Sequence, residues 1–140
     1  MFNYKKENNI KKGFTLVELL VVIVIISTLT GIVAPRVHQQ IDRSKWNLTK
    51  PKMDPIETAI DAYYVNCGRY PGSLYDLLEN PGIETWSGPY LKPKQLKDPW
   101  GFDYEYVPVG TINPGGYDII SYGKDGVLGG DGYNAEQYND

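Results

Sequence analysis

The sequence predicts an α+β fold in which a long N-terminal helix packs on a small antiparallel sheet, and three features predict it. Residues 14–34 form an apolar run with one charged residue, Glu18. Apolar residues then recur at three- and four-residue steps as far as Cys67, the spacing of an amphipathic helix. Beyond that point proline and glycine separate short segments such as "FDYEYV", which alternate as strands do.

Length and charge limit what the chain can be. Its 140 residues leave room for one small domain. The first 13 residues hold four lysines and one glutamate, whereas the whole chain carries a net charge of −3, so the acidic residues lie later. From Asp98 onward eight acidic residues accompany a single basic one, Lys124, which argues against nucleic acid as a partner.

No group of residues in the sequence suggests acid–base catalysis. Cys67 is the single cysteine, so no intramolecular disulfide can form, and we expect a small buried apolar residue there. His38 is the single histidine and is expected on a solvated helix face. A membrane-tethered periplasmic enzyme or solute-binding module would need converging titratable groups, so we predict that the chain is not an enzyme.

The apolar run is long enough to cross a membrane. As a helix, residues 14–34 would extend about 32 Å, close to the roughly 30 Å of hydrocarbon in a bilayer. The preceding lysines predict a cytoplasmic leader and an outward-facing remainder. A cleavable secretory signal fits poorly, because Ile32 stands where a small residue is needed and Pro35 where the new N-terminus would form. A plain anchor gives no reason for Glu18, since a carboxylate at bilayer depth is costly unless it is neutralised.

The segment "KKGFTLVELLVVIVIISTLTGIVAPRV" resembles the class III leader of type IV pilins and type II secretion pseudopilins. The resemblance implies that a prepilin peptidase cuts between Gly13 and Phe14 and methylates the Phe14 amine. It also implies that Glu18 faces the Phe14 amine of a neighbouring subunit, so that the two charges cancel and set the axial register. Residues 1–13 would then be a cleaved leader, residues 14–35 a transmembrane and filament-core helix, and residues 36–140 a periplasmic globular domain.

The helix is expected to continue past the membrane. Between Gly31 and Pro35 we expect it to bend or loosen, because proline removes one hydrogen bond and clashes with the preceding turn. Family members usually keep this helix unbroken to its end, and we expect the same here. Pro51 and Pro55 leave open a division near residues 49–54, with Asp54 as the cap of the second segment.

The apolar face of the second half of the helix should cover the sheet. That face contains Met53, Ile56, Ile60, Tyr63 or Tyr64, and Cys67. Gly68 is expected to end the helix, and Ser73 to cap a short helix that runs to Glu79. Strands are expected at residues 102–107 and 117–121.

The order of further motifs narrows the resemblance from pilin-like proteins in general to one subfamily. "GRYP", "GPYLK", "LKDPWG", "YEYV" and "YDIISYGKDGVLGGDG" follow one another as in the major pseudopilins of the type II secretion system. This implies a single-pass inner-membrane subunit of a periplasmic filament that drives export of folded proteins. Its partners would be itself, minor pseudopilins, the prepilin peptidase and the inner-membrane assembly platform. The alternative is a type IV pilus subunit for adhesion, DNA uptake or motility, but such pilins usually carry a C-terminal cysteine pair.

The segment "SYGKDGVLGGDGYNAE" combines five glycines with two aspartates, a composition that suits either Ca²⁺ or a flexible acidic tail. The resemblance favours one bound Ca²⁺. It implies Asp125 and the carbonyls of Tyr122 and Val127 as ligands, with Asp131 and Asn134 later in the loop and Glu136 in reserve. We expect no regular secondary structure there, so the ion would supply the order.

Overall fold

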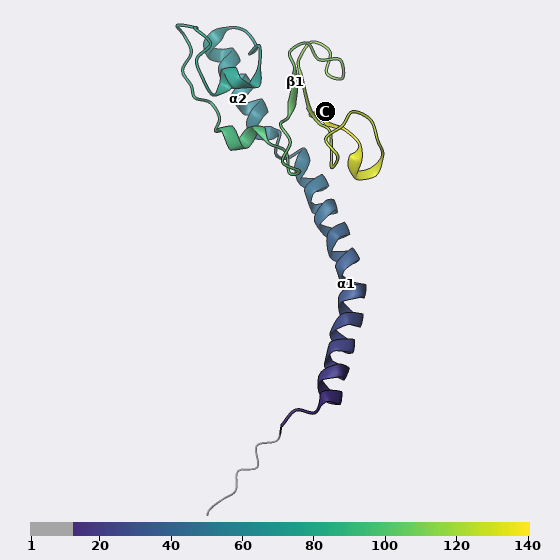
Figure 1. Ribbon diagram of the computed structural model, residues 1–140. Coiled ribbons are helices and arrows are strands. Elements are labelled where there is room, and N and C mark those ends of the chain that lie inside the picture. The colour runs from purple at the N-terminus through teal and green to yellow at the C-terminus, as the bar shows by residue number, and fades with distance from the viewer. Residues whose placement is uncertain (1–12) are drawn as a thin grey trace, which may run out of the picture. The chain divides into compact units, whose positions relative to one another are not determined.

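The computed structural model describes residues 13–140, and most of the expected leader, residues 1–12, lies outside the described residues. Contacts divide the chain into two compact units, Met1–His38 and Gln39–Asp140. The elements, drawn in Figure 1, are α1 (Leu16–Thr49), α2 (Asp54–Cys67), η1 (Leu74–Leu77), η2 (Pro93–Leu96), β1 (Glu105–Val107), β2 (Asp118–Ser121), η3 (Gly132–Asn134) and β3 (Gln137–Tyr138).

The first part of α1 has the properties of a membrane span. Within residues 13–140 it supplies the one helical stretch long and apolar enough to cross a bilayer, with a mean hydropathy of 2.7. The side chains of residues 16–33 are exposed, and their hydroxyls bond to the helix itself: Ser27 Oγ donates to Ile23 O at 2.7 Å and Thr30 Oγ1 to Ile26 O at 2.8 Å. The helix continues through Pro35, as expected. The bend there stays a prediction.

The expectation of an unbroken long helix is wrong. α1 ends at Thr49, residues 50–53 form a turn, and α2 begins at Asp54. Proline supplies no N–H and disfavours helical geometry in the residue before it, so Pro51 and Pro55 together interrupt the hydrogen-bond ladder. Met53, not Asp54, occupies the cap position.

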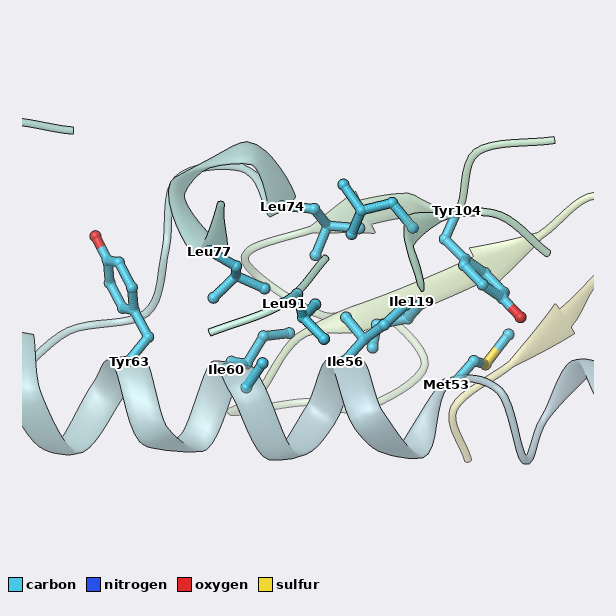
Figure 2. Packing of buried hydrophobic residues seen from close by; sticks show 11 residues of the cluster. Met53, Ile56, Ile60, Tyr63, Leu74, Leu77, Leu91, Tyr104 and Ile119 are labelled. Carbon is cyan, nitrogen blue, oxygen red and sulfur yellow. The ribbon is translucent and has the colours of Figure 1, made fainter. Parts of the chain in front are cut away.

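The core of the second unit forms on one face of α2. Figure 2 shows Ile56, Ile60 and Tyr63 projecting from this helix, and Met53 from the turn before it, toward the loops and the sheet. They pack with residues of η1, η2, β2 and the segments between them: Leu74, Leu77, Leu91, Leu96, Tyr104 and Ile119. Burial of each such side chain contributes about 1.5–3 kcal/mol. Of the two candidate tyrosines, Tyr63 is buried, whereas Tyr64 is 47% exposed.

The segment after α2 follows the expected turn chemistry with one shorter element. Gly68 has the left-handed φ of 70°, and its N–H donates to Tyr64 O at 2.8 Å, which confirms the predicted helix end. The short helix after Ser73 is a 3₁₀ helix that ends at Leu77, before the expected Glu79.

The sheet is antiparallel, with the order β1-β2-β3. All four residues of β2 are buried, as suits a central strand. β1 begins at Glu105 and not at residue 102, because Tyr104 N–H donates to Leu96 O at 2.9 Å and so pairs with the segment before the turn. The sequence pattern did not predict β3.

Candidate functional site

The expected processing site lies just before α1. Gly13 and Phe14 precede the helix, and the Phe14 side chain is 83% exposed. Thr15 and Glu18 form a reciprocal cap: Thr15 N–H donates to Glu18 Oε2 at 3.0 Å, and Glu18 N–H donates to Thr15 Oγ1 at 3.2 Å. Glu18 thus satisfies a free N–H of its own helix. The Thr-x-x-Glu spacing in the sequence could have indicated this second role.

The C-terminal loop, residues 122–136, leaves the sheet at the end of β2. The buried carboxylate of Asp98 holds this end of β2 in place. Its Oδ1 accepts the N–H groups of Trp100, Gly101 and Phe102, each at 2.9 Å, and its Oδ2 accepts the Ser121 hydroxyl at 2.7 Å. The "KDPWG" turn is therefore tied to the residue from which the loop departs.

The two ends of the loop lie against each other. Lys124 N–H donates to Tyr133 O at 2.8 Å. Gly123 has φ +71°, and a Cβ there would lie 2.7 Å from the carbonyl oxygens of Tyr133 and Ala135. Only glycine allows this approach. The loop also contains η3, so the expectation that it has no regular secondary structure is wrong.

Three of the predicted ligands, Asp125, Val127 and Asp131, lie between Lys124 and Tyr133, and the other two, Tyr122 and Asn134, lie just outside this pair. Asp125 Oδ1 accepts the Val127 N–H at 3.2 Å, and Asn134 N–H donates to Asp131 O at 3.1 Å, which brings those two residues into one turn. Tyr122 lies at the base, where its hydroxyl donates to Glu105; this bond, together with burial, raises the pKa of Tyr122 to about 12.

Glu136, the reserve ligand, accepts the Gly129 N–H, and that hydrogen bond lowers the pKa of its carboxyl. The bond spans the loop from its tip to its end. The Glu136 side chain thus links the end of the loop to the backbone of its tip.

The donor set fits Ca²⁺ in chemistry. Asp125 and Asp131 supply carboxylates, Asn134 an amide oxygen, and Tyr122 and Val127 carbonyls, all of them the hard oxygen ligands that calcium prefers. Across residues 13–140 the side chains of Asp131 and Asn134 enter no hydrogen bond, so their oxygens are available. In the same range no three His, Cys, Asp or Glu side chains gather closely enough to hold a metal. Asp125, Asp131 and the reserve ligand Glu136 therefore do not form such a group, whereas the amide and carbonyl ligands of the predicted set are outside this criterion.

Comparison with known proteins places the chain in a family. The family described as "Type II secretion system (T2SS), protein G" matches residues 36–140, and the prokaryotic N-terminal methylation motif matches residues 8–34. The type II secretion system core protein G of Xanthomonas campestris is 38% identical over 125 residues, which cover 89% of this chain and 86% of that protein. The Pseudomonas aeruginosa core protein G is 33% identical over 133 residues, covering 90% and 92%.

A solved structure has the same fold. The major pseudopilin from the type 2 secretion system of enterohaemorrhagic Escherichia coli matches with a TM-score of 0.58 at 23% identity, covering 75% of this chain and 94% of that one. These matches favour a type II secretion protein over a type IV pilus subunit. The chain belongs to the type II secretion system protein G family.

Proposed function

We propose that this chain is the major structural subunit of a type II secretion pseudopilus. The observation that carries the proposal is the combination, in one chain, of a methylation-type leader, a membrane-length helix and a protein G domain. The peptidase cuts after Gly13 and methylates Phe14. Residues 14–35 then hold the subunit in the inner membrane, with residues 36–140 in the periplasm. Copies polymerise there into the filament that drives folded proteins across the outer membrane.

Glu18 acts in the assembly step. Within one chain its carboxylate already accepts the N–H of Thr15. After cleavage the Phe14 amine is a free cation, and a second copy can present that cation to the carboxylate. The pair cancels two charges in an apolar filament core and fixes the stagger between subunits, a contribution to specificity rather than to net stability. Minor pseudopilins and the inner-membrane assembly platform are the other partners.

The C-terminal loop binds one Ca²⁺ in this proposal. The chemistry of its donor set and its closure by backbone contacts support the site. Asp125, Asp131 and Asn134 contribute side-chain oxygens, and Tyr122 and Val127 contribute carbonyls. The ion adds positive charge to an acidic loop and gives order to its exposed tip. The protein itself carries out no catalysis and acts as a building block.

The assembly role is tested by complementation. A bacterium that lacks its own protein G gene receives wild type or Glu18→Gln, and we expect the variant to be cleaved and membrane-inserted but to form no filaments and to restore no secretion. Ser27→Ala is the matched control, because Ser27 is an exposed polar residue of the same helix that bonds only to its own backbone. Normal filaments from Glu18→Gln would overturn the role of Glu18. Filaments without restored secretion from wild type would favour a type IV pilus subunit.

A further inference from the structure

The last residues of the chain contact one face of the end of α1. Asp42 and Trp46 on α1 and Lys50, the first residue after the helix, recur every four residues and form one stripe. Four residues of the C-terminal segment contact this stripe, and together we name them the C-terminal clamp: Lys124, Tyr133, Gln137 and Asp140.

Each of the three residues in the stripe has its own contact with the C-terminal clamp. Lys124 Nζ lies 2.6 Å from Asp42 Oδ2, and Asp140 Oδ1 lies 2.5 Å from Lys50 Nζ. Between these ion pairs, Tyr133 packs edge-on against Trp46 with ring centroids 6.1 Å apart. Gln137 Nε2 donates to Trp46 O at 3.1 Å. The clamp therefore extends over the last turns of α1, directly before the helix is interrupted.

The end of α1 needs such support. Carbonyls in the last turn of a helix lack partners within the helix, and Pro51 can offer no N–H. Besides the clamp, Tyr104 OH donates to Thr49 O at 3.0 Å, and Lys45 lies over the Trp100 ring at 5.2 Å. The clamp in turn continues into the core through Asn139, which donates to Glu57 Oε1 at 2.8 Å and accepts Ile119 N–H at 2.8 Å.

How firmly the clamp residues hold α1 depends on how well ordered the C-terminal loop is. Exposed ion pairs such as Lys50–Asp140 contribute little by themselves, because solvent and salt screen them. Lys124 and Tyr133 are joined by a backbone hydrogen bond at the base of the loop, and the residues between them form the loop tip that carries three proposed Ca²⁺ ligands. If that tip is disordered, holding Lys124 and Tyr133 in place costs conformational entropy. Whatever orders the tip therefore strengthens the contact with α1.

We propose that the C-terminal loop is a cation-controlled clamp on α1. The proposal rests on the calcium site proposed above and extends it from the loop to the helix. When Ca²⁺ occupies the loop, the clamp holds residues 42–49 of α1 to the globular domain. Without the ion these turns open locally, next to the turn at residues 50–53.

Hydrogen exchange tests the coupling on the full-length chain in detergent. With saturating Ca²⁺, compared with chelator, we expect amides of residues 42–49 to exchange about tenfold more slowly. Ca²⁺ binding is measured separately by calorimetry. In the double variant Asp42→Asn, Gln137→Ala we expect Ca²⁺ to bind still, but the protection of these amides to be lost. Asp103→Asn is the matched control, since it breaks the exposed Lys97–Asp103 ion pair, which does not involve α1.

The possible results distinguish the clamp proposal from the calcium-site proposal. Ca²⁺ binding to wild type with unchanged exchange at residues 42–49 would overturn the clamp and leave the calcium site standing. Absence of Ca²⁺ binding would overturn both. Equal protection in the double variant and in Asp103→Asn would show that the ion acts on α1 by another route, which also overturns the clamp.

Discussion

Asp118 is a buried carboxylate that organises the loop before β2. Its Oδ2 accepts the N–H groups of Thr111 at 2.6 Å and Ile112 at 3.0 Å, and its Oδ1 accepts the N–H of Asn113 at 2.9 Å. Burial raises the pKa of this carboxyl, but the hydrogen bonds from Ile112, Asn113 and Thr111 outweigh that effect and lower the pKa to about 2. The charged form is therefore the form that the fold stabilises.

This pKa predicts a loss of stability in acid. Because the pKa of Asp118 is lower in the folded chain than its ordinary value of 3.8, the stabilisation is complete above about pH 4 and is lost as the pH falls toward about 2. We expect the stability advantage of wild type over Asp118→Asn to shrink by about 2 kcal/mol across that window. Urea unfolding of both proteins at several pH values measures it. A difference that does not change with pH would contradict the assignment.

Tyr63 and Tyr64 illustrate what the sequence leaves open at this scale. Both positions satisfy the helical spacing of the apolar face, and adjacent residues differ by only 100° around a helix. Tyr63 is the buried one, and it packs edge-on against Tyr90, with centroids 5.8 Å apart. That partner lies 27 positions later in the chain. Local spacing could not choose between the two tyrosines, because the choice depends on a distant contact.

At the scale of elements, the packing of the two ends of the C-terminal loop means that two of its glycines should differ in how well they tolerate substitution. Gly123 and Gly129 both have positive φ, at +71° and +89°, but a Cβ meets backbone oxygens only at Gly123. We expect Gly129→Ala to cost about 1 kcal/mol, the conformational penalty alone, and Gly123→Ala to cost at least about twice as much. Thermal unfolding of the two variants in the presence of Ca²⁺ compares them. Equal melting temperatures would mean that the ends of the loop do not pack as described.

The division of the long helix could be predicted only as an alternative. Pro51 and Pro55 are visible in the sequence, but proline inside α1, at Pro35, does not end the helix. The difference is that the turn at residues 50–53 has tertiary partners: Tyr104 bonds to Thr49 O, and Lys52 Nζ lies 3.4 Å from Lys97 O. β3 was missed for a similar reason. It has two residues, and its pairing with β2 sets its conformation.

At the scale of the whole molecule, features encoded in one continuous segment could be predicted from the sequence, whereas contacts between distant segments could not. The leader, Glu18 and the membrane-length run are contiguous in the sequence, so the resemblance that implies their roles could be recognised from one segment. The contact of Lys124 with Asp42 joins positions 82 apart and has no signal in the sequence. Asp98 likewise appeared as one acid among many, although it holds the departure point of the loop. The calcium ligands and the processing site stay predictions.

The central claim is that this chain is processed as a pilin-class subunit, and intact-mass spectrometry tests it most directly. The protein is expressed together with its prepilin peptidase, with Gly13→Ala as the control. We expect wild type to lose residues 1–13 and to gain one methyl group on Phe14, and the control to keep its full mass. A wild-type chain that stays uncleaved, or one cut after Ala34, would contradict the account and leave Glu18 without its partner amine.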